Sequence, residues 1–169
     1  MRDKIVRSHY FFVVNSNTSI KNKTPEGKKR LEDFVIGLKK IFLSENILNF
    51  IRINDEKDKK IPKQDLIMDI NTEIDLEYGP ENGYLHAHID MIIDHMSNIT
   101  LVCNRITKYY ADKFGLSVFC PPPKFIEDKT HAIKKYSRKM QRYTNLYITT
   151  QLINIDGERE IFTKKYSRY

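Results

Sequence analysis

The sequence predicts an α+β domain in which helices flank a central antiparallel sheet. Apolar and polar residues alternate through residues 66–77 and again through 84–94, which is typical of half-buried strands. The segment 78–83 between them holds two glycines and a proline, so an antiparallel hairpin is predicted. Residues 31–42 instead carry apolar side chains at helical spacing. The chain has 169 residues, so we expect one domain over residues 1–169.

The other elements follow from local signals. The apolar run of residues 5–15 predicts a buried central strand that ends in a polar turn. Thr24 followed by Pro25 predicts a helix start, since threonine caps helices and proline suits the first helical position. Further along we expect a strand at 47–53, a charged loop at 55–63, a helix at 98–114, a strand at 116–120 ended by prolines 121–123, a helix at 129–142, and a closing hairpin at 146–162 around Asp156-Gly157.

His86 and His88 are the most informative pair of residues. Side chains two residues apart in a strand point to the same face, so both imidazoles can reach one metal ion. Pairing across the predicted hairpin places Glu77 near His86 and Asp75 near His88. We predict a metal site formed by His86, His88 and Glu77, with Asp75 as the alternative carboxylate. Solvated histidines on a polar strand face are the competing interpretation, and the aligned carboxylates favour metal.

The chemistry of this ligand set narrows the choice of ion. Nitrogen and oxygen ligands without a thiolate suit magnesium, manganese or zinc. A site that leaves coordination positions for water or substrate suits reactions at phosphate.

A second candidate group lies on the predicted helix 129–142. Tyr136 and Lys139 are three residues apart and therefore share one helical face. A phenol that attacks a phosphodiester must lose its proton, and a nearby cation stabilises the charge. Ile133, Tyr136 and Met140 also form an apolar stripe on this predicted helix. Taken without the rest of the chain, this pattern favours a tyrosine that packs in the core. Tyr110 repeats the spacing with Lys113, but it lies in a core-like stripe and ranks behind Tyr136.

Charge and composition point to a polyanionic partner inside a cell. Lysines and arginines outnumber acidic residues by 29 to 22, which gives a net charge of +7. Cys103 and Cys120 form no disulfide framework, which is typical of a reducing compartment. No apolar run reaches membrane-spanning length and no signal peptide is evident, so we expect an intracellular protein that is not secreted and contacts no membrane. Basic residues flank Tyr136 and are candidates for DNA phosphate contacts: Lys134, Lys135, Arg138 and Arg142.

The order of these motifs resembles the HUH endonuclease family. A hydrophobic strand ending in Asn15 comes first, then Glu77 with His86-Ala87-His88, and then a helix with Tyr136 and Lys139. The resemblance is to the nuclease domain of rolling-circle replication initiators (Rep) of circular single-stranded DNA viruses and related plasmids. It covers roughly residues 5–142.

This resemblance implies an RRM-like or ferredoxin-like HUH nuclease fold and a metal-dependent DNA nickase and strand-joining enzyme. A divalent ion, Mn²⁺ or Mg²⁺, would be held by Glu77, His86 and His88. Tyr136 would attack the scissile phosphate to give a 5′-phosphotyrosine, and Lys139 would orient or stabilise this nucleophile. The implied partner is single-stranded DNA at a replication origin, in a host nucleus or a prokaryotic cytoplasm, with host or viral replication proteins as further partners.

Two other classes of protein stay open. A single-tyrosine HUH transposase would use the same chemistry, although its tyrosine helix usually offers glutamine where this chain has Lys139. A non-enzymatic RRM-like module would bind nucleic acid on a similar sheet without metal. The chain lacks a nucleotide-binding Gly-x4-Gly-Lys loop, so we expect no helicase domain.

Overall fold

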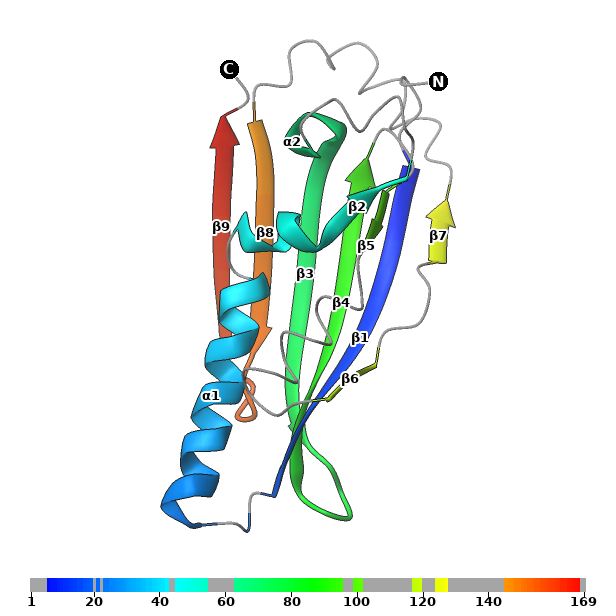
Figure 1. The fold of residues 1–169 in the computed structure, drawn as a ribbon. Coiled ribbons are helices and arrows are strands. Elements are labelled where there is room, and N and C mark those ends of the chain that lie inside the picture. Colours follow the sequence, from blue (N-terminus) through cyan, green and yellow to red (C-terminus); the bar gives the residue numbers. More distant parts are fainter. Residues whose placement is uncertain are drawn as a thin grey trace.

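The computed structural model describes residues 6–19, 21, 23–42, 45–54, 63–95, 99–101, 117–119, 124–127 and 145–167. These residues form a mixed α+β fold, which confirms the predicted class. A seven-stranded sheet makes up most of it, and a separate two-stranded sheet pairs β2 (Ile51–Ile53) with β5 (Ile99–Leu101). Figure 1 shows the long helix α1 (Pro25–Phe42) lying against one face of the main sheet.

The main sheet has the order β6-β1-β4-β3-β8-β9, with β7 also paired to β1. Its strands are β1 (Val6–Ser19), β3 (Ile67–Tyr78), β4 (Tyr84–His95), β6 (Ser117–Phe119), β7 (Lys124–Glu127), β8 (Asn145–Ile153) and β9 (Arg159–Ser167). The remaining elements are α1 (Pro25–Phe42), the 3₁₀ helix η1 (Glu45–Phe50), β2 (Ile51–Ile53), α2 (Lys63–Leu66) and β5 (Ile99–Leu101).

One junction of the sheet is parallel. β3 and β8 run in the same direction, whereas every other pair in the main sheet is antiparallel. The predicted central antiparallel sheet therefore carries one parallel pair, which the sequence did not indicate. Alternation of apolar and polar residues reveals hairpins between strands that are neighbours in the chain. A parallel pair needs a long crossover connection, so β3 and β8 are far apart in the sequence and no local pattern links them.

Helix α1 begins as predicted. The Gly27 backbone N–H donates to Thr24 Oγ1 at 3.1 Å, which is the N-cap hydrogen bond that the sequence indicates. The predicted stripe is confirmed where its side chains are described, because Phe34, Leu38 and Phe42 are almost fully buried. The Phe42 ring meets Phe12 of β1 edge-on with ring centroids 5.7 Å apart. This contact fixes which face of the sheet α1 covers.

Alternation along the strands gives the sheet two unlike faces. The face under α1 is apolar and holds Tyr10, Phe12 and Val14 of β1, Ile70, Ile74 and Leu76 of β3, and Leu85, Ala87, Ile89, Met91 and Ile93 of β4. The opposite face is polar. Among the described residues no helix covers it (Figure 1), and it presents the predicted metal ligands.

Two expected elements differ from the structure. Residues 47–53 were expected to form one strand, but η1 continues to Phe50 and only Ile51–Ile53 are extended. The expected helix 98–114 is wrong at its start, because Ile99–Leu101 form β5 and pair with β2. Ile99 and Thr100 are β-branched and favour an extended strand, here one that pairs with β2. The rest of that helix, and the whole of the expected helix 129–142, lie outside the described residues.

The other local predictions agree better. β1 runs on to Ser19 rather than ending in a turn at Asn15, but its register against β4 shifts just after Asn15. There the Asn17 backbone N–H donates to Asn15 Oδ1 at 2.8 Å, and Asn17 has a φ of 55°. Strand β6 falls inside the predicted segment 116–120, and the closing hairpin β8–β9 is confirmed. Its turn contains Gly157 at a φ of 85°, a conformation that favours glycine.

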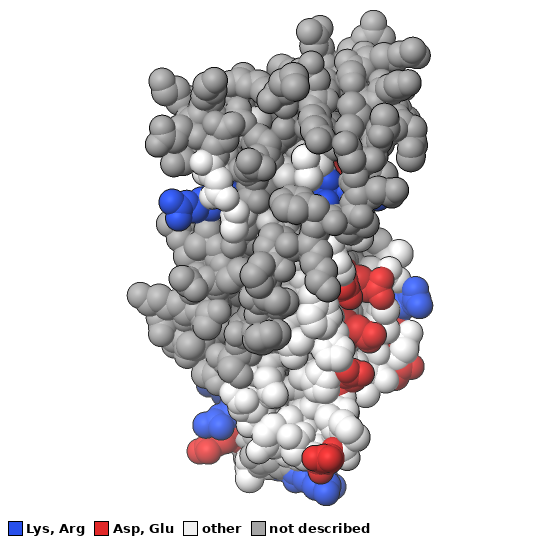
Figure 2. All heavy atoms as spheres, turned by 90° about the vertical axis from the view of Figure 1, so that its right-hand side faces the viewer, with Lys and Arg blue, Asp and Glu red and all other residues white. Residues whose placement is uncertain are grey.

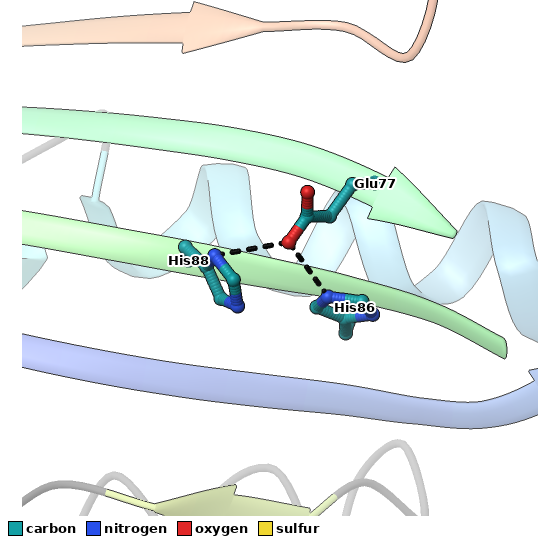
Figure 3. A group of neighbouring side chains, drawn as sticks. All are labelled: Glu77, His86 and His88. Carbon is teal, nitrogen blue, oxygen red and sulfur yellow. Dashed lines mark hydrogen bonds and ion pairs between the residues drawn. The ribbon is translucent and has the colours of Figure 1, made fainter. Parts of the chain in front are cut away.

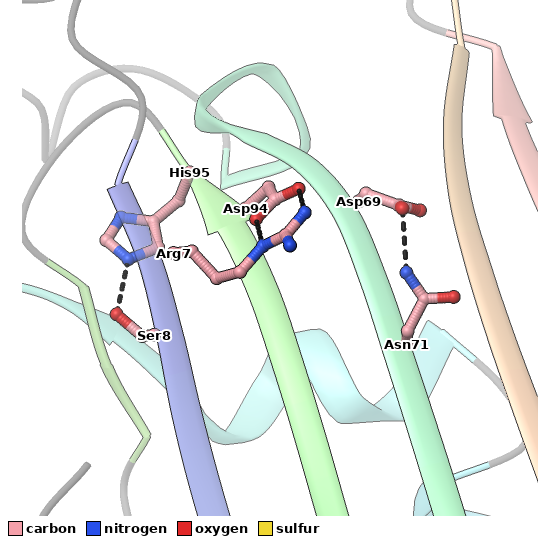
Figure 4. Close-up of polar contacts among 6 residues, drawn as sticks. All are labelled: Arg7, Ser8, Asp69, Asn71, Asp94 and His95. Atoms are coloured by element: carbon pink, nitrogen blue, oxygen red, sulfur yellow. Dashed lines mark hydrogen bonds and ion pairs between the residues drawn. The ribbon is translucent and has the colours of Figure 1, made fainter. Parts of the chain in front are cut away.

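A polar cluster closes the end of the sheet where β4 ends (Figure 4). The Arg7 guanidinium donates two hydrogen bonds, of 2.7 and 2.8 Å, to the two carboxylate oxygens of Asp94. Asp69 of β3 lies directly opposite Asp94 of β4, and it accepts a 2.7 Å hydrogen bond from the Asn71 side-chain amide. Burial raises the pKa of Asp69; the Asn71 hydrogen bond lowers it in part, and the facing Asp94 carboxylate raises it further. Charged Asp69 therefore opposes folding.

Asp69→Asn is expected to stabilise the protein at neutral pH. Because the folded state holds the Asp69 proton more tightly than the unfolded chain, the native protein loses stability as pH rises from the ordinary pKa of 3.8 through the raised one. The amide removes this effect and a like-charge pair, a gain of roughly 0.2–1 kcal/mol. Urea unfolding at pH 7 and at pH 3.5 measures it. The gain should be clearly smaller at the lower pH, where Asp69 is mostly protonated, and an equal gain at both would contradict the charge argument. Glu73→Gln, exposed on the same strand, should have little effect.

Candidate metal centre

The hairpin brings the predicted ligands together in the predicted register. Glu77 of β3 is the direct partner of His86 on β4, and Asp75 is the partner of His88. Leu76 and Ala87, the intervening pair, point into the core and are buried. Their burial fixes the register, because a slip of one residue would expose the apolar pair and bury the polar residues.

Glu77 lies between the two histidines on the polar face (Figure 3). Its Oε1 atom is 2.9 Å from His86 Nε2 and 3.0 Å from His88 Nδ1. The imidazole rings are 4.9 Å apart between centroids. One ligand atom from each residue lies within 4.8 Å of the others, and no second group of this kind occurs among the residues that the structure describes.

These separations fit a metal ion. Adjacent ligands bound at about 2.1 Å to one octahedral ion stand about 3 Å apart, close to both Glu77 distances. The same distances are those of hydrogen bonds, so a proton or a metal ion fits between the groups. His86 is 17% exposed, whereas His88 and Glu77 are 40% and 48% exposed. The site is therefore open to solvent on the side away from the sheet, as a site that admits substrate requires.

The surroundings orient both imidazoles. His86 Nδ1 lies 3.3 Å from the Tyr84 carbonyl oxygen. In the tautomer with the proton on Nδ1, the Nδ1–H group donates to that carbonyl oxygen and the lone pair of Nε2 is left for an ion. This is the usual arrangement of metal-binding histidines. The His88 ring is flanked by Phe11 of β1, with centroids 5.8 Å apart. These contacts restrict how each imidazole can turn.

One side-chain contact near the candidate site was not predicted from the sequence. Asp90, on the polar face of β4, forms a 2.7 Å hydrogen bond with the imidazole of His9 on β1. Neither residue belongs to the group of Glu77, His86 and His88. Asp75, the alternative ligand, is exposed and does not join the group of Glu77, His86 and His88. The geometry thus favours Glu77 over Asp75.

The polar face is acidic around the candidate site. Seen from the β1 edge of the sheet, acidic side chains gather on one side of the described surface (Figure 2). One row of side chains on β3, here called the β3 polar row, consists of Asp69, Asn71, Glu73, Asp75 and Glu77. A divalent cation is attracted to such a face, whereas a bare phosphate is repelled.

The candidate nucleophile and its neighbours cannot be placed against this cluster. Tyr136 and Lys139 lie outside the described residues, as do the candidate DNA-contacting residues Lys134, Lys135, Arg138 and Arg142. Tyr110 lies outside them as well. Their roles therefore stay predictions from the sequence.

Comparisons with protein-family models, with curated proteins and with solved structures found no match to this chain. Within the described part of the chain, no helix is long and apolar enough to cross a membrane.

Proposed function

We propose that this protein is a metal-dependent nickase and strand-joining enzyme for single-stranded DNA that initiates rolling-circle replication. The observation that carries the proposal is the convergence of Glu77, His86 and His88 on one open face of the sheet. The order of Asn15, these ligands, and Tyr136 with Lys139 along the chain supports it. A non-enzymatic RRM-like module would have no use for such a ligand set.

The sheet also suits the RRM-like architecture that this proposal implies. In the order β6-β1-β4-β3, the first strand is central and pairs antiparallel with the second strand of the β3–β4 hairpin. Helix α1 connects β1 to the part of the chain that leads to this hairpin. A ferredoxin-like arrangement has the same strand order and direction, and β8 and β9 extend it at the β3 edge.

The proposed reaction conserves the number of phosphodiester bonds. A bound Mn²⁺ or Mg²⁺ would polarise the scissile phosphate. The Tyr136 phenolate oxygen forms a bond to phosphorus, and the bond from phosphorus to the 3′-oxygen breaks. The phenol proton leaves to solvent, and the departing 3′-oxygen takes a proton from solvent to become a free 3′-hydroxyl. Lys139 stabilises the charge of the phenolate and the phosphate. Attack by another 3′-hydroxyl reverses the step and joins strands.

Cleavage of end-labelled oligonucleotides tests this proposal. Single-stranded DNA from the origin of the replicon that encodes the protein is incubated with it and Mn²⁺ or Mg²⁺, and the products are separated under denaturing conditions. A 3′-labelled strand should move to a slower, protease-sensitive species, because the 5′-phosphate is then attached to the protein. A 5′-labelled strand should yield a shorter free fragment. No adduct with either ion, or one that forms in excess chelator, would overturn the metal-dependent mechanism.

A further inference from the structure

The polar face of the sheet is interrupted by an apolar strip beside the candidate metal centre. Phe11 and Val13 of β1 and Ile92 of β4 occupy positions on this face and are partly exposed. Val13 pairs with His88, and Phe11 pairs with Asp90, so the strip begins at the level of the metal ligands. On β3 the equivalent positions are polar throughout. The site is therefore bordered by apolar surface on one side and by carboxylates on the other.

Phe11 is the aromatic member of the strip, and its ring lies beside that of a candidate metal ligand. Its ring centroid is 5.8 Å from that of His88, and the two ring planes are tilted by 49°. Buried Tyr10 and Phe12 on either side point to the α1 face and anchor the strand. A part-exposed aromatic ring therefore lies next to a candidate metal ligand, on the polar face of the sheet.

We propose that Phe11 is a stacking platform for an unpaired nucleobase next to the phosphate at the metal centre. This inference rests on the proposed function and adds the path of the substrate. Stacking on an aromatic ring suits single-stranded DNA, because every base has a π face. The β3 polar row repels phosphates, so the DNA backbone passes over β1 and away from β3.

Tryptophan fluorescence tests this path directly. The chain contains no tryptophan, so Phe11→Trp makes a single reporter. Its emission should be quenched when oligothymidylate is added with Mn²⁺, because a stacked base contacts the indole. Tyr147→Trp is the matched control. Tyr147 lies on β8, on the same face of the sheet as Phe11, and its exposed fraction is 42%. It pairs with Asp69, a member of the β3 polar row. Its emission should change little. Equal quenching of both variants would overturn the proposed path.

Affinity measurements separate stacking from a purely structural role. Phe11→Leu keeps an apolar side chain but removes the π face, and it should weaken oligothymidylate binding about five- to 100-fold. Its Mn²⁺ affinity should match that of the native protein. If Phe11 only positions His88, the substitution would instead lower Mn²⁺ affinity and leave DNA affinity intact, and the inference would be wrong. The Leu variant also decides the question if the Trp variant fails to fold.

The same experiments distinguish failure of this inference from failure of the proposed function. Covalent adduct formation by the native protein, together with unchanged DNA affinity of Phe11→Leu, would refute the stacking platform alone. Absence of both adduct formation and single-stranded DNA binding in the native protein would refute both proposals.

Discussion

His86→Ala and His88→Ala are each expected to lower Mn²⁺ affinity by ~100-fold or more and to abolish covalent attachment to DNA. Each substitution removes one of the three ligands that converge within 4.8 Å. Loss of a residue that only supports a ligand already costs about 10–100-fold in affinity, so loss of a ligand should cost at least as much. Isothermal titration with Mn²⁺ and the adduct assay measure the two effects.

The matched control for the histidines is His9→Ala. His9 lies on the same face and is hydrogen-bonded to Asp90, but it is not part of the cluster. It should retain native metal affinity and adduct formation. If all three histidine variants behave alike, the loss reflects a general change of the polar face rather than coordination, and the assignment of ligands is wrong.

A pair of carboxylate variants tests the third ligand in the same assays. Glu77→Gln removes the charge but keeps the shape of the side chain, and Asp75→Asn does the same two residues earlier on the same face. Both residues are exposed and each pairs with one of the histidines. Only Glu77→Gln should weaken Mn²⁺ binding strongly. A larger loss for Asp75→Asn would mean that the ion recruits the other carboxylate.

The candidate site could be predicted because its geometry is encoded locally. Alternation on both strands and a short turn define the partners of Glu77 and His86, and burial of Leu76 and Ala87 fixes the register. The start of α1 was equally local, because Thr24 and Pro25 carry the capping signal. These features depend on interactions over a few residues or across one turn.

Features that depend on distant partners were not predictable in this way. The parallel pairing of β3 with β8 depends on how the chain crosses the sheet, which no local pattern records. Ile99–Leu101 form a strand because β2 is available to pair with them, against an apparent helical pattern. The hydrogen bond between His9 and Asp90 likewise joins residues of β1 and β4 that only the tertiary fold brings together.

Tyr136→Phe is expected to abolish covalent attachment and nicking while leaving metal and DNA binding intact. The substitution removes only the hydroxyl, so without it no oxygen is available to form the bond to phosphorus. Removing the nucleophile of an enzyme that forms a covalent intermediate lowers turnover by orders of magnitude, roughly 10⁶-fold in the best-studied case. The adduct assay and strand cleavage report this loss, and Mn²⁺ titration with oligonucleotide binding shows that the site is otherwise preserved.

Tyr110→Phe is the matched control, because Tyr110 has the same spacing to a lysine, Lys113. It should form the adduct at the native rate. Peptide mapping of the native adduct after protease digestion gives an independent answer, since the modified peptide must contain Tyr136. Loss of the adduct in Tyr110→Phe with retention in Tyr136→Phe would move the nucleophile to the helix expected directly after the histidine strand. Retention in both variants would mean that another residue forms the bond, and the parallel between Tyr136-x-x-Lys139 and the HUH tyrosine helix would then be wrong.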